Sequence, residues 1–268
     1  MTGVVFARSL RDTRRSTALW ALGMVALVAF TVAFYPSVKG NASFEQVFDD
    51  LPEAVRTLVG AHEGVPFTSP PGYLHGRLFS VMVPVLLIIL GSGLGARAIG
   101  GSEGDGTLEL VLAHPVSRTR VVAERFGAVV AVLATVSATL TVSLLALAPL
   151  VGLLDDVPVD RLLAANAAAF CLALLHTSVA FAVGCAVGRS GPPVAVATSV
   201  AAGGYLLQSL AAIGGGLPVI QTLSPWHWYL DRNILVDGLP AAAVTGPLLL
   251  TAILFAAAVY LFNRRDLR

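Results

Sequence analysis

Charged side chains are scarce in this sequence, and long stretches have none. Only 12% of the 268 residues are charged, whereas 56% are hydrophobic. A soluble domain usually carries charge on about a quarter of its residues. The composition therefore excludes an ordinary soluble protein and indicates a chain solvated largely by lipid. The formal net charge of +1 carries little information about partners. No nucleic-acid partner is expected.

Cysteine is nearly absent. Cys171 and Cys185 lie in one uncharged stretch, where 14 helical residues would separate them by about 21 Å. A disulfide requires Cα atoms within about 7 Å. An internal disulfide is therefore excluded, and both thiols are expected to pack as small apolar side chains.

Motifs for nucleotide or metal chemistry are also missing. The segment "GCAVGRS" (184–190) has the wrong spacing for a phosphate-binding loop, with arginine in place of lysine, and the chain has no H-E-x-x-H zinc motif. The chain is therefore predicted not to be an enzyme and to bind no cofactor or metal itself. A primary transporter built on it must use a separate ATPase.

The uncharged stretches contain few groups that could act on a substrate. An intramembrane protease using Ser92 and His176 is an alternative, although "GSG" (91–93) lacks the glycine expected two positions before the serine. Ion-coupled carriers usually retain Asp, Glu, Lys or Arg inside the membrane, and here all such residues lie between the uncharged runs. This argues against an ion-driven carrier. Candidate pathway-lining residues, whose alternative is structural packing, are Asn166, His176, Gln208, Ser209, Trp226 and Trp228.

Long apolar runs predict six membrane spans. Crossing the hydrocarbon layer takes about 20 helical residues, and lipid-exposed backbone must pair within its own segment. We therefore predict an all-α membrane protein with a single transmembrane domain over residues 1–268. The expected spans are approximately 17–35, 78–99, 121–151, 161–188, 193–213 and 241–262.

The arrangement of basic residues predicts the orientation. With six spans and a cytoplasmic N-terminus, 12 basic residues lie inside and five outside, namely Lys39, Arg56, Arg77, Arg161 and Arg232. A seventh span in the run 190–230 would change this to ten against seven. Because cytoplasmic loops carry the excess of Lys and Arg, six spans with both termini cytoplasmic are preferred.

The outer loop 36–77 is expected to hold two short amphipathic helices at the outer interface. Ser43 and Gln46 have capping-box spacing, and Pro52 suits a first helical turn.

Near the last span, "SPWHWY" (224–229) is typical of the aromatic belt at the headgroup layer, with contact to a laterally moving substrate as the alternative. Gly91 and Gly95 have G-x-x-x-G spacing, which suits helix packing in the bundle or between subunits.

The segment 101–118 is a polar interruption between spans two and three. After its glycines, Thr107 can cap a short helix over "LELVLA", which Pro115 ends. A helix of two turns is unstable alone in water. We therefore expect this cytoplasmic segment to pack on the membrane interface or on another protein.

The sequence "EGDGTLELVLAHPVSRTRVVAERF" resembles the signature of type-2 ATP-binding-cassette (ABC) permeases, and "LPEAVRTLVG", "PPGYLHGRLFSVMVP", "SPWHWY" and "NRRDLR" are similar to segments of such permeases. The chain departs from the signature at "GSEGDG", where relatives often have consecutive glutamates. The resemblance implies that this segment is a coupling helix that docks on the ATPase. The implied ATPase-coupling residues are Glu103, Gly106, Thr107, Leu108, Glu109, Leu110, Leu112, Pro115 and Arg118.

The resemblance also implies a function. Two six-span permeases, identical or similar, would pair with two ABC ATPase subunits, which bind the ATP and Mg. The expected role is permease of an exporter for a hydrophobic or amphipathic drug-like or lipid-like substrate, surrounded by membrane lipid in the cytoplasmic membrane of a bacterium. The alternative is a non-transporting membrane scaffold or sensor that recruits a cytoplasmic partner.

Overall fold

The computed structural model describes residues 3–52, 55, 64–104, 106, 108, 116–214 and 222–265. Within these residues the ordered elements are helices, and no strand occurs. The prediction of an all-helical protein is thus confirmed for the described part of the chain.

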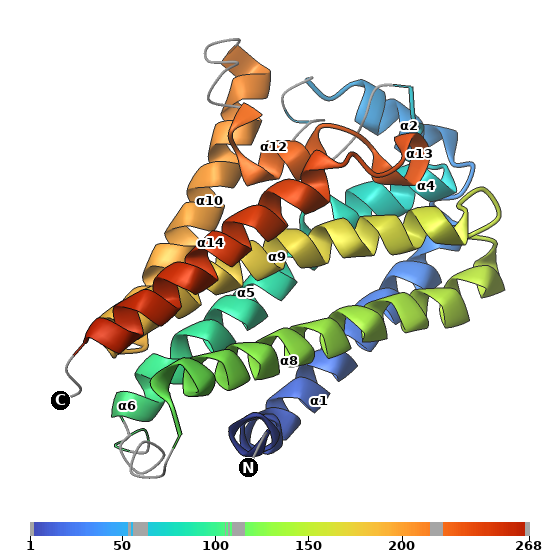
Figure 1. Cartoon of the computed structure of the whole chain (residues 1–268). Coiled ribbons are helices and arrows are strands. Elements are labelled where there is room, and N and C mark those ends of the chain that lie inside the picture. Colours follow the sequence, from blue (N-terminus) through green and yellow to red (C-terminus); the bar gives the residue numbers. More distant parts are fainter. Residues whose placement is uncertain are drawn as a thin grey trace.

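Six long helices make up most of the fold, and shorter helices connect them (Figure 1). The long helices are α1 (Val4–Phe34), α5 (Met82–Ala96), α8 (Arg118–Leu147), α9 (Val159–Val187), α10 (Gly191–Gly214) and α14 (Ala242–Arg264). The short ones are α2 (Ala42–Asp49), α4 (Pro70–Leu74), α6 (Ser102–Gly104), α12 (Pro225–Leu230) and α13 (Ile234–Asp237). π-helical turns at His75–Phe79 and Arg97–Gly101 join α4, α5 and α6 into one continuous rod.

The six long helices run alternately between two ends of the molecule. Both termini and α6 lie at one end, here named the terminal end, and α2, α4, α12 and α13 lie at the other, the far end (Figure 1). Five helical rods among the described residues are long and apolar enough to cross a membrane: Val4–Ser37, Pro70–Gly104, Arg118–Val151, Val159–Val187 and Ala242–Arg264. Helix α10, with 24 residues, lies where the sequence predicts the fifth of six spans.

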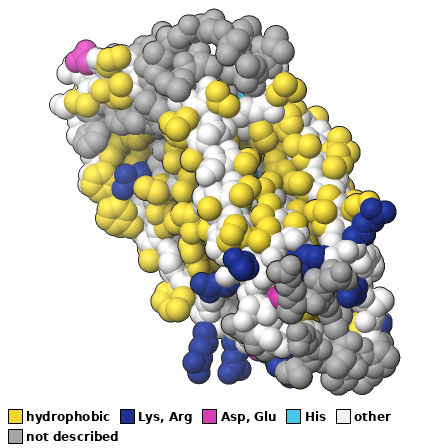
Figure 2. Space-filling model, turned by 90° about the vertical axis from the view of Figure 1, so that its left-hand side faces the viewer, with side chains coloured by type: hydrophobic (Ala, Val, Ile, Leu, Met, Phe, Trp, Pro, Cys, Tyr) yellow, Lys and Arg dark blue, Asp and Glu magenta, His cyan; other side chains and the backbone are white. Residues whose placement is uncertain are grey.

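Helix α9 is the centre of the bundle. Its most apolar window is 72% buried, against 22% for those of α1 and α14, and it packs against α5, α8, α10 and α14. Hydrophobic side chains cover the middle of the face drawn in Figure 2, and Lys and Arg side chains gather mainly toward the terminal end. The apolar middle and the basic end of this face are the surface expected of a multi-pass membrane protein.

Helix α1 begins well before its predicted span, at Val4 instead of residue 17. Its 31 residues extend about 46 Å. Its first backbone N–H groups are capped by Glu124 of α8, whose carboxylate accepts from Gly3, Val5 and Phe6 at 3.0–3.1 Å. A carboxylate at this position satisfies otherwise unpaired donors and complements the helix dipole. Arg120 holds it in place, with Nε 2.9 Å from Oε1.

Replacing Glu124 by alanine should therefore detach the start of α1 from α8. Loss of a helix cap typically costs about 1–2 kcal/mol, so we expect a fall of a few degrees in the thermal midpoint and faster proteolysis before Thr17. Asp12→Ala is the matched control, because Asp12 is exposed and makes only a 3.9 Å ion pair with Arg8. Equal behaviour of the two variants would contradict the capping role.

Gly91 and Gly95 pack within the chain and not between subunits. A Cβ at Gly91 would lie 1.9 Å from Oγ1 of Thr177, and one at Gly95 would lie 2.7 Å from the Thr177 carbonyl oxygen and 3.3 Å from the Phe181 amide nitrogen. Both glycines thus allow α5 to approach α9 closely. This resolves the choice that the sequence leaves open for this pair.

The far end differs from expectation at two places. Helix α2 is the first of the predicted amphipathic helices, but Asn41 caps it in place of Ser43, and Asn41 Oδ1 accepts from Ser43 N at 3.1 Å. The second predicted helix lies largely outside the described residues. The belt prediction is wrong for Trp226 and Tyr229, which are 1% and 2% exposed.

Tyr229 is buried because α12 turns back against α9, α10 and α14. Its hydroxyl donates to the Phe79 carbonyl oxygen. Burial raises the pKa of the Tyr229 phenol, which therefore stays a neutral donor and joins α12 to the start of the α5 rod.

Candidate functional site

Residues 101–118, here named the coupling segment after the role predicted for them, follow an irregular helical turn at the terminal end. The π-helical turn Arg97–Gly101 leads into α6, and Gly106 then closes a turn by donating its N–H to the Glu103 carbonyl at 3.0 Å. Gly106 has φ +68°, a conformation that residues with a Cβ rarely adopt. The glycine of the permease-like signature is therefore required by the backbone.

An ion pair ties this exit to the last helix. Arg265, directly after α14, pairs its guanidinium with Glu103 and also donates to the Cys185 carbonyl at 3.0 Å. The two side chains are only 19% and 12% exposed. Gly188 lies beneath the pair, since a Cβ there would be 2.4 Å from Arg265 Nη2. Glu103, Arg265 and the Cys185 carbonyl are together named the Arg265 cluster.

Arg118 reinforces the same connection. Its Nη1 donates to the Arg265 carbonyl at 2.7 Å and to the Phe262 carbonyl at 3.4 Å. A cation that bonds the last carbonyls of a helix satisfies free acceptors and complements the dipole. Arg118 thus links the start of α8 to the end of α14.

Leu108 anchors the coupling segment in the bundle. It is 1% exposed and packs in a cluster at the terminal end with eight other buried residues: Ile99, Val121, Val122, Phe181, Ala182, Cys185, Ala258 and Phe262. Its side chain therefore faces the permease core and is not free to contact an ATPase directly. The other predicted coupling residues, Thr107, Glu109, Leu110, Leu112 and Pro115, lie outside the described residues.

Arg125 is a buried cation near this exit. It is 7% exposed, and its Nη1 donates to the carbonyl of Ala98 in the π-helical turn, while its Nε has no hydrogen-bond partner. Irregular turns leave carbonyls without helical partners. Arg125 thus stabilises the turn that connects α5 to the coupling segment.

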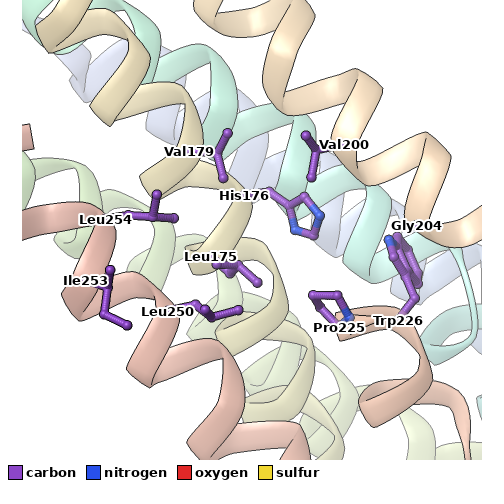
Figure 3. A pocket seen from close by; sticks show the side chains of 10 residues that line it. All are labelled: Leu175, His176, Val179, Val200, Gly204, Pro225, Trp226, Leu250, Ile253 and Leu254. Atoms are coloured by element: carbon purple, nitrogen blue, oxygen red, sulfur yellow. The ribbon is translucent and has the colours of Figure 1, made fainter. Parts of the chain in front are cut away.

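A lateral pocket of about 240 Å³ lies between α9, α10, α12 and α14 (Figure 3). His176 and Trp226, two of the predicted pathway residues, line it together with eight others: Leu175, Val179, Val200, Gly204, Pro225, Leu250, Ile253 and Leu254. Val200 and Ile253 are 49% and 56% exposed. The pocket therefore meets the lateral surface between α10 and α14.

The other predicted pathway residues do not line this pocket. Asn166 exchanges hydrogen bonds with Ser137 across α8 and α9, at 3.1 and 3.3 Å. Ser209 donates to the Tyr205 carbonyl of its own helix at 2.9 Å. Trp228 donates to the Thr222 carbonyl at 2.7 Å, and Gln208 Oε1 is buried without a partner.

The protease alternative requires a base next to the serine. Ser92 is buried, and its hydroxyl has no hydrogen-bond partner. His176 Nδ1 is bonded to the Leu172 carbonyl at 2.8 Å. The contact that would activate a nucleophile is therefore not present between these two residues.

Sequence reasoning did not single out Arg265 or Arg125. Arg265 is the second of two adjacent arginines after an apolar run, and Arg125 is a single arginine before one. Their partners are 162 and 27 positions away in the chain. The only signal for Arg265 was its place in the terminal "NRRDLR" motif. Nothing in that motif distinguishes it from the exposed Arg264.

Comparison with known proteins identifies the family. The family model described as ABC-2 family transporter protein matches residues 4–267. No curated protein matches the chain significantly. The match covers nearly the whole chain, including the coupling segment, the Arg265 cluster and the lateral pocket. The protein therefore belongs to the ABC-2 transporter family and is a multi-pass permease component of an ABC transporter.

Proposed function

We propose that this chain is the membrane subunit of an ABC exporter that moves a hydrophobic or amphipathic substrate outward. In this proposal it crosses the bacterial cytoplasmic membrane six times with both termini inside. It pairs with a second permease, identical or similar, and with two separate ATPase subunits that bind and hydrolyse ATP. The chain itself contributes no catalytic residue.

The observation that carries the proposal is the attachment of the coupling segment. Its start is fixed to α14 by the Glu103–Arg265 ion pair, and Leu108 is fixed in the core formed with α8, α9 and α14. A displacement of the segment would therefore be transmitted to three long helices. A partner that contacts it differently in two states can shift the bundle between conformations.

The orientation and the substrate class have separate support. The basic side chains gather toward the end that holds both termini and the coupling segment (Figures 1 and 2), which matches a cytoplasmic location. The lateral pocket is lined almost wholly by apolar side chains. An apolar lining favours a substrate that partitions into the membrane over an ion or a sugar.

Replacing Leu110 and Leu112 together by aspartate should release the ATPase. Each leucine lost from an apolar interface costs about 1.5–3 kcal/mol, so binding should weaken about a hundredfold or more. The measurement is co-purification of a co-expressed ABC ATPase, with its ATP hydrolysis in nanodiscs. Leu150→Asp is the control, because Leu150 is 76% exposed at the far end.

Co-purification that survives the double variant, with the permease monodisperse, would contradict the proposed docking segment. ATPase that stays bound but is never stimulated by the permease would favour the scaffold or sensor instead. Because Leu108 faces the core, we expect Leu108→Asp to lower the yield of folded permease, which makes it unsuitable for this test.

A further inference from the structure

The lateral pocket contains two polar groups in an otherwise apolar lining. Trp226 is 1% exposed, and its indole N–H has no hydrogen-bond partner. Buried polar groups are nearly always paired. An unpaired donor in the wall of a cavity therefore points to an acceptor that a bound molecule would supply.

His176 adds the complementary group. It is 1% exposed, and its Nδ1 lies 2.8 Å from the Leu172 carbonyl oxygen. A carbonyl only accepts, so Nδ1 must carry the proton of this bond, and Nε2 of the neutral imidazole is left as an acceptor. His176 and Trp226 stand on different elements, α9 and α12, on either side of the space in Figure 3.

Backbone packing fixes the position of Trp226. A Cβ at Gly204 would lie 3.0 Å from Trp226 Cδ1, so the indole rests directly on the backbone of α10. Tyr205 holds it from the same helix, with ring centroids 5.1 Å apart in an edge arrangement. The unpaired N–H is therefore held in place by its surroundings, as expected of a preorganised donor.

The volume limits what can bind. A dry cavity of about 150 Å³ accepts benzene, whereas pockets that enclose a drug-sized molecule begin at about 300 Å³. The 240 Å³ here is enough for one ring or a short branched chain with a small substituent. The exposed Val200 and Ile253 leave room for the rest of a larger molecule to extend between α10 and α14.

From these observations we infer that the lateral pocket binds the apolar end of an amphipathic molecule that carries a hydroxyl or amide group. That group accepts from Trp226 Nε1 and donates to His176 Nε2. The inference rests on the proposed export function for its role as a substrate subsite. Binding itself requires neither ATP nor the ATPase.

The test uses the full chain in nanodiscs, without ATPase. Trp20→Phe and Trp228→Phe leave Trp226 as the only tryptophan, and 4-bromophenol serves as a quenching probe of the right size. We expect the quenching of Trp226 fluorescence to saturate as the probe concentration rises. Probe that partitions into the lipid should add only a linear component. The isostere 4-bromotoluene, with a methyl in place of the hydroxyl, should bind about two- to tenfold more weakly. His176→Leu should reduce this difference, because only the bond from Trp226 Nε1 would remain.

Two neighbouring leucines on α14 provide matched variants. Leu250 lines the pocket, so Leu250→Phe should fill it and weaken probe binding at least tenfold. Leu249 is 64% exposed and does not line it, so Leu249→Phe should bind the probe normally. Equal quenching in both, or no saturable quenching, would overturn the inference.

A further arm identifies the source of any occupant. In nanodiscs of brominated phosphatidylcholine without probe, Trp226 quenching that Leu250→Phe relieves and Leu249→Phe does not would show a lipid chain in the pocket, which would overturn the inference. Saturable probe binding in a permease that fails to recruit ATPase would leave the inference standing and contradict the export function. Loss of probe binding with intact ATPase recruitment would overturn the inference and leave the export function standing.

Discussion

Replacing Gly95 by leucine should separate α5 from α9 and destabilise the whole bundle. The new Cβ would meet the Thr177 carbonyl at 2.7 Å and the Phe181 amide at 3.3 Å. Both atoms belong to the backbone of the most buried helix, which cannot rotate away as a side chain can. Overpacking of this kind costs about 3 kcal/mol, which corresponds to a fall of about 6–12 °C in the midpoint of thermal unfolding.

Gly93→Leu is the control for this prediction. Gly93 lies on the same helix two residues earlier, and a Cβ there meets nothing within 4 Å. Both variants gain the same helix propensity and lose the same unfolded-state freedom, so their difference isolates the steric clash. Midpoints are measured by differential scanning fluorimetry in one detergent. A Gly95→Leu protein as stable as Gly93→Leu would contradict the packing of α5 on α9.

Arg265→Ala should have the second large effect, because it leaves Glu103 without its cation. Removing one partner of a fully buried ion pair costs about 3–5 kcal/mol. The pair here is 19% and 12% exposed, so we expect about 2–3 kcal/mol and a fall of about 5–10 °C in the thermal midpoint. The start of the coupling segment should also become accessible to protease, since its link to α14 is lost.

Arg264→Ala is the neighbouring control. Arg264 is exposed at the end of α14, and its guanidinium lies over the Tyr260 ring at 4.5 Å, so little stability should be lost. The charge reversal Glu103→Arg with Arg265→Glu should recover about half of the lost stability, because it restores the ion pair and not the bond to the Cys185 carbonyl. A reversal no better than Arg265→Ala alone would show that the pair itself does not stabilise the bundle.

The helices were predictable because their signal is local. A run of about 20 uncharged residues has one stable backbone conformation in lipid, and α8, α9 and α14 begin within three residues of the predicted spans. The start of α1 was missed because its cap comes from Glu124, far away in the chain. No local pattern before Thr17 indicates a partner on α8.

The candidate site was only partly predictable. The permease-like signature predicts a coupling segment directly after α5 and α6, and Gly106 has the left-handed backbone that explains a glycine there. The direction of Leu108 was not predictable, since "LELVLA" is apolar on most of its surface. Of the six pathway candidates, His176 and Trp226 share the pocket, and their common place depends on how α12 folds back on α9.

The sequence by itself determined the helical class, the approximate position of each long helix and the family, because hydropathy and a contiguous signature are properties of neighbouring residues. Tertiary structure alone decided which glycines bring helices together, which arginines are buried and which polar groups face the lateral pocket. Those outcomes depend on contacts between residues far apart in the chain, and in a sequence this uniformly apolar the surface of a helix does not reveal which neighbour will cover it.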